Sequence, residues 1–194
     1  KQGQRFLTLY DDWYRDGYFL FTTEAYEDGF IIFGEEQLLL DEANDMVGGT
    51  EDGSYNSSAI ITMNDDGIAY AGLIGLFEND QNGTSCDPVL ENGNACFHTP
   101  IFKMSTDYGE NWSGNGGDYY GDYHHIPSDV WNHMIDNAFT DYYDPCADTS
   151  SVLVDVWTYY NYDIKVDANG DPHFLVQVMA SDADGFGYYS SGDG

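Results

Sequence analysis

The chain has 194 residues, enough for one domain with a substantial core. Its 35 acidic and 5 basic residues give a formal net charge of −30, which disfavours nucleic acid and anionic membrane surfaces as partners. Aromatic residues make up 16% of the chain, so it is expected to fold despite its acidity. No apolar run is long enough to span a bilayer, so no membrane insertion is expected.

Short apolar runs separated by turn dipeptides predict an all-β domain. Asp-Gly or Asn-Gly occurs ten times, and these dipeptides tolerate the positive φ angles of tight hairpin turns. The runs between them are rich in β-branched and aromatic residues, as strands are. The expected strands, in chain order, are 18–23, 29–34, 58–63, 68–77, 98–105, 151–160, 162–167 and 173–181.

One short helix is expected inside a long insertion, residues 113–150. Ser128 can cap it, and apolar residues then recur at helical spacing, which places the helix near 129–139 and packs its apolar stripe against the sheet. The same insertion is rich in aromatic residues that could stack on a sugar or contact a protein. The candidate ligand contacts are Tyr119, Tyr120 and Tyr123.

The cysteines point to an oxidising compartment. Cys86 and Cys96 lie in a polar loop that Pro88 and the Asn92-Gly93 pair can turn back on itself, which predicts a local disulfide. Cys146 has no assigned partner. Three free thiols are the alternative.

A weak internal repeat accompanies the turns. Residues 60–71 align with residues 163–174, and Gly67 falls on Gly170. Both segments have a strand, a turn and a strand, with an amide or acidic residue three positions before the glycine. Residues 23–33 form a poorer third copy. Repeated hairpins predict the blades of a propeller or a related array.

Residues 105–112 carry the most specific motif. Ser105, Asp107, Gly109 and Trp112 follow the spacing S-x-D-x-G-x-x-W. A carboxylate at the third position can accept hydrogen bonds from turn N–H groups, the glycine permits a left-handed residue, and the tryptophan can pack under the loop. The segment resembles the Asp-box, or BNR repeat, of sialidase-like β-propellers. That resemblance implies blades of antiparallel sheet, with the box between the third and fourth strands of a blade, on the side away from the ligand.

The resemblance therefore implies a structural box and gives no catalytic residue. Sialidases hold a substrate carboxylate with three arginines, and this chain has only Arg5 and Arg15. The chain alone cannot supply that triad, so a non-enzymatic role is favoured over sialidase activity. A glycoside hydrolase or lyase of sialidase-like fold stays open as an alternative. Glycosidases other than sialidases need a pair of carboxylates, and spacing alone does not select a pair among the 35 acidic residues.

A calcium site is the other chemical hypothesis. Asp167, Asn169 and Asp171 place oxygen atoms at alternate positions, a spacing that can surround Ca²⁺. An ordinary hairpin turn is the competing interpretation. A calcium-stiffened adhesin or structural domain is accordingly a third function hypothesis. The acidic charge could reflect calcium binding or a saline habitat.

Residues 1–194 are thus expected to form one segment of a secreted or cell-surface bacterial β-propeller. Two or three blades do not close a propeller, so the segment is expected to come from a longer chain. The favoured role is non-catalytic binding or surface display, with carbohydrate or protein at the cell surface as partner. The composition also resembles propeller cargo of type IX secretion, which makes outer-membrane secretion machinery a further expected partner.

Overall fold

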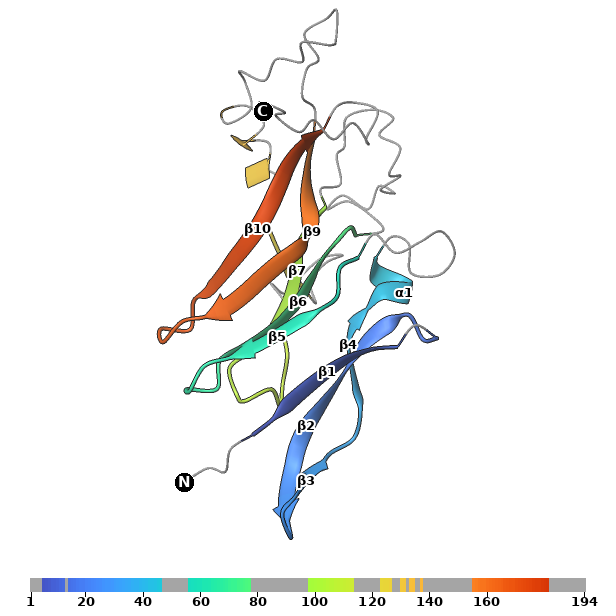
Figure 1. The fold of residues 1–194 in the computed structure, drawn as a ribbon, viewed down its shortest axis with the longest axis vertical. Helices are drawn as coiled ribbons and strands as arrows, with labels where there is room; N and C mark the ends of the chain where they lie inside the picture. Colours follow the sequence, from blue (N-terminus) through green and yellow to red (C-terminus); the bar gives the residue numbers. More distant parts are fainter. Residues whose placement is uncertain are drawn as a thin grey trace, which may run out of the picture.

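The computed structural model describes residues 5–12, 14–46, 56–77, 98–113, 123–126 and 155–181, together with Val130, Trp131, His133, Met134 and Asn137. These residues form mostly antiparallel β-sheet with few helical residues, which agrees with the expected all-β class. Figure 1 shows the strands in three layers: a first sheet, a middle sheet and a C-terminal hairpin. Within the described residues these layers form a stack and do not close into a ring.

The first sheet consists of β1 (Leu7–Asp12), β2 (Gly17–Glu27), β3 (Phe30–Phe33) and β4 (Gln37–Asp41). β2 pairs with β1, with β4 along its first half and with β3 along its second half. Asp28 and Gly29 both have positive φ, as the tight β2–β3 turn requires. The sequence patterns predict neither β1 nor β4, because acidic residues interrupt or flank both short apolar runs.

The middle sheet is a four-stranded antiparallel meander. Its strands are β5 (Ile60–Met63), β6 (Ala69–Gly75), β7 (Thr99–Ser105) and the short β8 (His124–His125), and they lie in chain order. Every residue of β6 is buried, since layers cover this strand on both faces. The expected strands at 58–63, 68–77 and 98–105 are confirmed.

The third layer is one long hairpin made of β9 (Asp155–Val166) and β10 (Pro172–Ser181). The prediction of two separate strands, 151–160 and 162–167, is wrong: β9 runs through Asn161 without a turn. The physical reason is a bulge. Tyr162 pairs with Val176 and Thr158 pairs with Val178, so Asn161 falls in an irregular stretch of a continuous ladder.

Two apolar interfaces hold the layers together. Leu20 and Leu40 of the first sheet belong to one buried cluster with Leu73 and Ile101 of the middle sheet. On the opposite face of the middle sheet, β9 lies against β5, β6 and β7. There the rings of Phe102 and Phe174 lie 4.9 Å apart, and Ile164 is completely buried.

Helical structure is sparse in the described residues. The sequence does not predict α1 (Glu42–Asp45), which follows β4 directly and is capped by the Asp41 carboxylate on the N–H of Asn44 at 3.2 Å. In the expected 129–139 helix, the described residues 130, 131, 133, 134 and 137 are helical. Trp131 is 2% exposed and its indole N–H donates to Thr99 Oγ1 of β7 at 3.2 Å.

Candidate functional site

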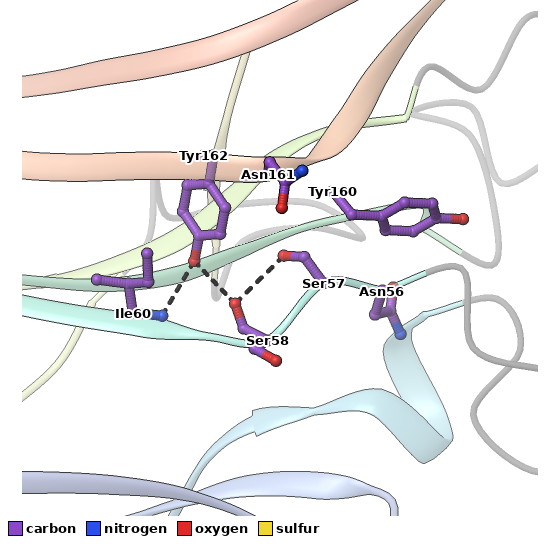
Figure 2. A pocket seen from close by; sticks show the side chains of 7 residues that line it. All are labelled: Asn56, Ser57, Ser58, Ile60, Tyr160, Asn161 and Tyr162. Atoms are coloured by element: carbon purple, nitrogen blue, oxygen red, sulfur yellow. Dashed lines mark hydrogen bonds between the residues drawn. The ribbon is translucent and has the colours of Figure 1, made fainter.

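A pocket lies between the middle sheet and the C-terminal hairpin (Figure 2). Its volume is about 600 Å³. Residues 56–60, which lead into β5, form one wall, and β9 forms the other. The lining side chains carry hydroxyl groups, amides and rings, with one aliphatic group and no charge: Asn56, Ser57, Ser58, Ile60, Tyr160, Asn161 and Tyr162.

Hydrogen bonds attach the wall formed by residues 56–60 to the neighbouring strands. The Tyr162 hydroxyl accepts the N–H of Ile60 at 3.0 Å and donates to the carbonyl of Gly72. Burial raises the pKa of Tyr162, so this hydroxyl is neutral at physiological pH. Ser57 Oγ accepts the N–H of Ile74 at 2.8 Å, and the Tyr18 hydroxyl donates to the Ser57 carbonyl at 3.0 Å. Hydrogen bonds to β9, β6 and β2 thus hold this wall in place.

The β9 wall presents a ring and an amide. Tyr160 packs edge-on against the buried His98, with ring centroids 5.1 Å apart. His98 Nδ1 is in turn hydrogen-bonded to the carbonyl of Thr158. Asn161, at the bulge, is exposed and lines the pocket. The ring of Tyr160 can stack on the apolar face of a ligand ring, and the side-chain amide of Asn161 can hydrogen-bond to ligand hydroxyl groups.

The buried carboxyl group of Glu42 contacts a residue that lines the pocket. Asn56 Nδ2 donates to Glu42 Oε1 at 2.9 Å, and Glu42 is only 7% exposed. Burial raises the pKa of Glu42 to about 7, with Asp11 and Asp16 adding repulsion that the Asn56 hydrogen bond partly offsets. Glu42 does not line the pocket, but its protonation state bears on the orientation of a residue that does.

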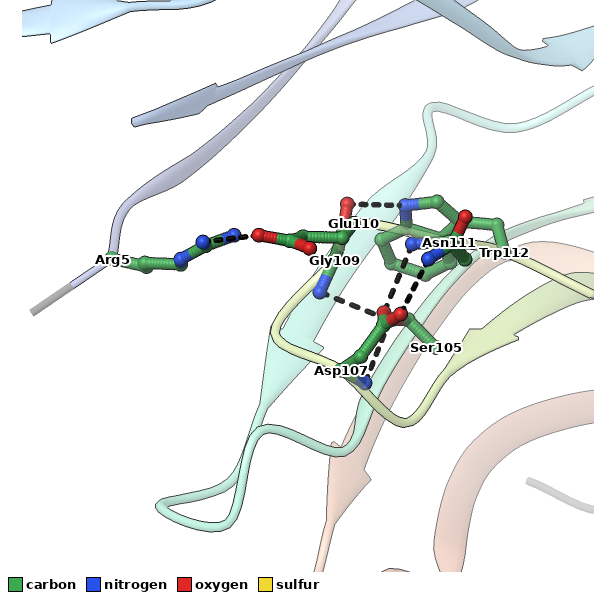
Figure 3. A network of polar contacts seen from close by, with 7 residues as sticks. All are labelled: Arg5, Ser105, Asp107, Gly109, Glu110, Asn111 and Trp112. Atoms are coloured by element: carbon green, nitrogen blue, oxygen red, sulfur yellow. Dashed lines mark hydrogen bonds and ion pairs between the residues drawn. The ribbon is translucent and has the colours of Figure 1, made fainter. Parts of the chain in front are cut away.

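Residues 105–112, which have the S-x-D-x-G-x-x-W spacing and are called the box below, form a closed hydrogen-bonded loop (Figure 3). Ser105 Oγ accepts the N–H of Gly109 at 2.9 Å and donates to Asp107 Oδ1 at 2.8 Å. Asp107 Oδ1 also accepts the N–H of Asn111 at 2.9 Å, and Asp107 Oδ2 accepts the Asn111 side-chain amide at 2.6 Å. Those bonds from Asn111, with a smaller effect of Ser105, lower the pKa of Asp107 to about 2. The Trp112 indole closes the loop by donating to the Gly109 carbonyl at 3.0 Å.

The box lies between the third and fourth strands of the middle sheet. It follows β7 directly, and the chain returns beside β7 through a bridge between Met104 and Ser113. The loop also reaches the first sheet. A Cβ on Gly109 would lie 2.7 Å from the Leu7 side chain, and Glu110 forms an ion pair with Arg5. The box is thus positioned to join sheets rather than to face a ligand.

The two aligned hairpin turns have the same hydrogen bonds. Asn64 Oδ1 accepts the N–H groups two and four residues on, at 3.1 and 3.0 Å, and Asp167 Oδ1 does the same at 2.8 and 3.0 Å. The aligned glycines also match: the N–H of Gly67 donates to the carbonyl of Asn64, and the N–H of Gly170 donates to the carbonyl of Asp167, both at 3.1 Å. The structure therefore bears out the alignment of residues 60–71 with 163–174. The poorer third copy is the β2–β3 hairpin.

These loops of the middle sheet and the C-terminal hairpin contact one another in a row, named the turn row here: residues 64–68, 105–112 and 167–171. The N–H of Tyr108 donates to the Gly67 carbonyl at 2.9 Å, which joins the box to the β5–β6 turn. Asn64 Nδ2 donates to the Asp167 carbonyl at 2.9 Å, which joins that turn to the β9–β10 turn. Most polar groups of the turn row thus bond within their own loops, and Asn64 Nδ2 joins the middle sheet to the C-terminal hairpin.

The proposed calcium ligands fall within this turn row. Asp167 Oδ1 accepts two backbone N–H groups, and Asp167 Oδ2 lies 3.4 Å from His173 Nε2. These bonds, led by the N–H of Asp171, lower the pKa of Asp167. Among the described residues, no group of three or more His, Cys, Asp or Glu side chains is arranged to hold a metal ion. Calcium binding by Asp167, Asn169 and Asp171 stays a prediction.

The predicted aromatic contacts have different outcomes. Tyr119 and Tyr120 lie outside the described residues, as do Cys86, Cys96 and Cys146. Tyr123 is only 4% exposed, so it offers no face to a ligand. Its hydroxyl donates to Asp45 Oδ2 at 2.7 Å and accepts the N–H of Asp41 at 3.1 Å, which ties the middle sheet to α1.

Sequence reasoning missed the pocket. Its two walls come from segments about a hundred residues apart, and neither contains a recognisable motif. One signal was present: residues 54–60 and 156–162 contain no charged residue in a strongly acidic chain.

No protein-family model, curated protein or solved structure matches the chain. In the described part of the chain, no helix has the length and apolarity needed to cross a membrane.

Proposed function

We propose that the chain is a segment of a secreted or cell-surface β-propeller that works as a non-catalytic binding module, with the pocket between residues 56–60 and β9 as its site for neutral carbohydrate. The propeller assignment is supported by the four-stranded meander, the place of the box between its third and fourth strands, and the repeated hairpins.

The observation that carries the ligand class is the uncharged lining of the pocket. The chain has a net charge of −30, yet every lining side chain is neutral. A cationic ligand would be attracted more strongly to the acidic surface outside the pocket than to the pocket itself. An anionic ligand would be repelled by that surface. A neutral sugar matches hydroxyl and amide groups through hydrogen bonds and matches Tyr160 through stacking.

Calorimetric titration with neutral gluco-, galacto- and xylo-oligosaccharides tests this proposal. Asn161→Ala is expected to weaken binding about tenfold, the effect of one lost hydrogen bond. Tyr160→Ala is expected to do at least as much. Tyr14→Ala removes a fully exposed ring outside the pocket and serves as the matched control. Binding that survives both pocket substitutions unchanged would contradict the proposal.

A glycoside hydrolase is the second candidate, and one observation favours it. Glu42 has a pKa of about 7, which suits a general acid. It contacts Asn56 but does not itself line the pocket, so binding without hydrolysis ranks first. Release of reducing sugar that Glu42→Gln abolishes would reverse this ranking.

A further inference from the structure

The first sheet ends in an exposed apolar strand, β3, which projects away from the middle sheet (Figure 1). Among the described residues, β3 pairs with β2 and no other strand. All four of its side chains are exposed: Phe30 at 70%, Ile31 at 39%, Ile32 at 40% and Phe33 at 39%. These four residues, with Tyr26 of β2 at 53%, are called the β3 edge below.

An edge strand of this composition is a template for another strand. Its outer N–H and C=O groups can form a ladder, and its side chains are apolar on both faces. Natural edges are blunted by charged residues or proline within the strand, and Phe30–Phe33 contains neither. Among the described residues β10 is also an edge strand without Asp, Glu, Lys or Arg, but its exposed side chains alternate with partly buried ones. β3 differs because all four of its apolar side chains are exposed.

The charges around the β3 edge decide which kind of strand fits. Five exposed acidic residues flank it in the sequence: Glu24, Glu27, Asp28, Glu35 and Glu36. Residues 24–36 contain no Lys or Arg, although Arg15 from the β1–β2 turn pairs with Glu36. A second copy of this chain would bring acidic flanks near acidic flanks. A strand with basic flanks would place opposite charges there.

We propose that the β3 edge binds an extended peptide segment of a partner protein, whose apolar residues are flanked by Lys or Arg, by adding it to the first sheet as a further strand. The main-chain ladder and the apolar side chains supply affinity, and the acidic flanks select the basic ends. This site is separate from the carbohydrate pocket, so the two proposals stand or fall independently.

Fluorescence anisotropy with a labelled peptide of alternating Val and Thr, carrying paired Lys at each end, tests the proposal. Saturable binding is expected, and it should weaken as salt rises because the flanks are exposed. The same peptide with paired Glu ends should bind at least about tenfold more weakly. A Lys-flanked peptide with proline at its centre should also lose binding, since proline removes a ladder donor.

Two variants locate the binding. Phe30→Ser with Ile32→Ser removes apolar contacts, and Glu27→Lys with Glu35→Lys reverses the flanks while leaving the strand intact. Each is expected to weaken binding about tenfold or more. Leu175→Ser, which changes a 75% exposed residue of β10, is the matched control and should bind normally.

Absent binding, or equal binding of the Glu-flanked peptide, would overturn the proposal. So would dimerisation in sedimentation experiments that the Phe30 and Ile32 substitutions abolish, because a second copy would then be the occupant of the β3 edge. Circular dichroism melts of each variant separate loss of binding from loss of folding.

Discussion

The turn row and the pocket are both built from polar side chains, but they use these side chains in opposite ways. In the turn row, Asp107 and Asp167 direct their oxygens at backbone N–H groups of their own loops. In the pocket, Asn161 and Tyr160 line open space. The recognisable motif therefore marks a loop whose polar groups hold its own conformation and bond to the neighbouring turn. The candidate ligand site carries no motif.

The largest effect is expected where the turns touch. Gly67 has φ +83°, and a Cβ there would lie 2.5 Å from the Tyr108 ring. Gly67→Ala should cost about 2–4 kcal/mol, from backbone strain and overpacking together. Gly29 has φ +87° with nothing within 4 Å of a Cβ, so Gly29→Ala measures the strain alone, about 1–2 kcal/mol. Equal losses in urea unfolding would show that the turns do not brace each other.

Beside the pocket, the pH dependence of stability reports on the buried Glu42 carboxyl group. The pKa of Glu42 is about 7 in the folded chain, above its ordinary value of 4.5, so the folded state holds this proton more tightly. The stabilisation is complete below pH 4.5 and is lost as pH rises to about 7. Glu42→Gln should therefore be about 1–3 kcal/mol more stable than the parent at pH 8 and nearly equal at pH 4.

Many other carboxylates also titrate, so only the difference between the two proteins is informative. Glu27→Gln, at an exposed position, is the matched control and should shift stability little at either pH. If the difference in unfolding free energy between Glu42→Gln and the parent is the same at pH 4 and pH 8, Glu42 is not a buried ionisable group.

Calcium should give the smallest effect. We expect Ca²⁺ to raise Tm beyond the rise from Mg²⁺ at equal concentration, by the equivalent of about 0.4 kcal/mol when free Ca²⁺ equals Kd. Asp167→Asn with Asp171→Asn should remove this difference. The first substitution preserves the turn, because Asn64 makes the same hydrogen bonds in the neighbouring turn. Equal shifts from both ions would leave only charge screening.

Local chemistry explains which parts of the fold could be predicted. Asp28-Gly29 and the turns at Gly67 and Gly170 are set by residues that accept positive φ, so the hairpins were predictable. β1 was not, because its two core-facing leucines, Leu7 and Leu9, are too few to stand out before Asp11 and Asp12. Pairing with β2, together with packing of Leu7 and Leu9 against the core, makes that segment a strand.

The box and the pocket also differ in how far the sequence predicts them. The spacing of the box lies within eight consecutive residues, so its loop could be predicted before its position in the sheet was known. The pocket depends on Tyr162 reaching Ile60 across about a hundred residues of sequence. Tyr123 was mistaken for a surface contact because sequence alone does not show that α1 provides partners for its hydroxyl.

One paired experiment tests most directly whether the turn row is structural and the pocket functional. Asp107→Ala and Asn161→Ala are each measured by thermal melting and by calorimetric titration with the neutral oligosaccharide that binds the parent best. Asp107→Ala should lose about 1–3 kcal/mol of stability with unchanged Kd, because it orphans backbone donors. Asn161→Ala should keep its Tm and weaken binding about tenfold. Loss of binding in Asp107→Ala at unchanged stability, with normal binding in Asn161→Ala, would show instead that the turn row binds the ligand and the pocket does not.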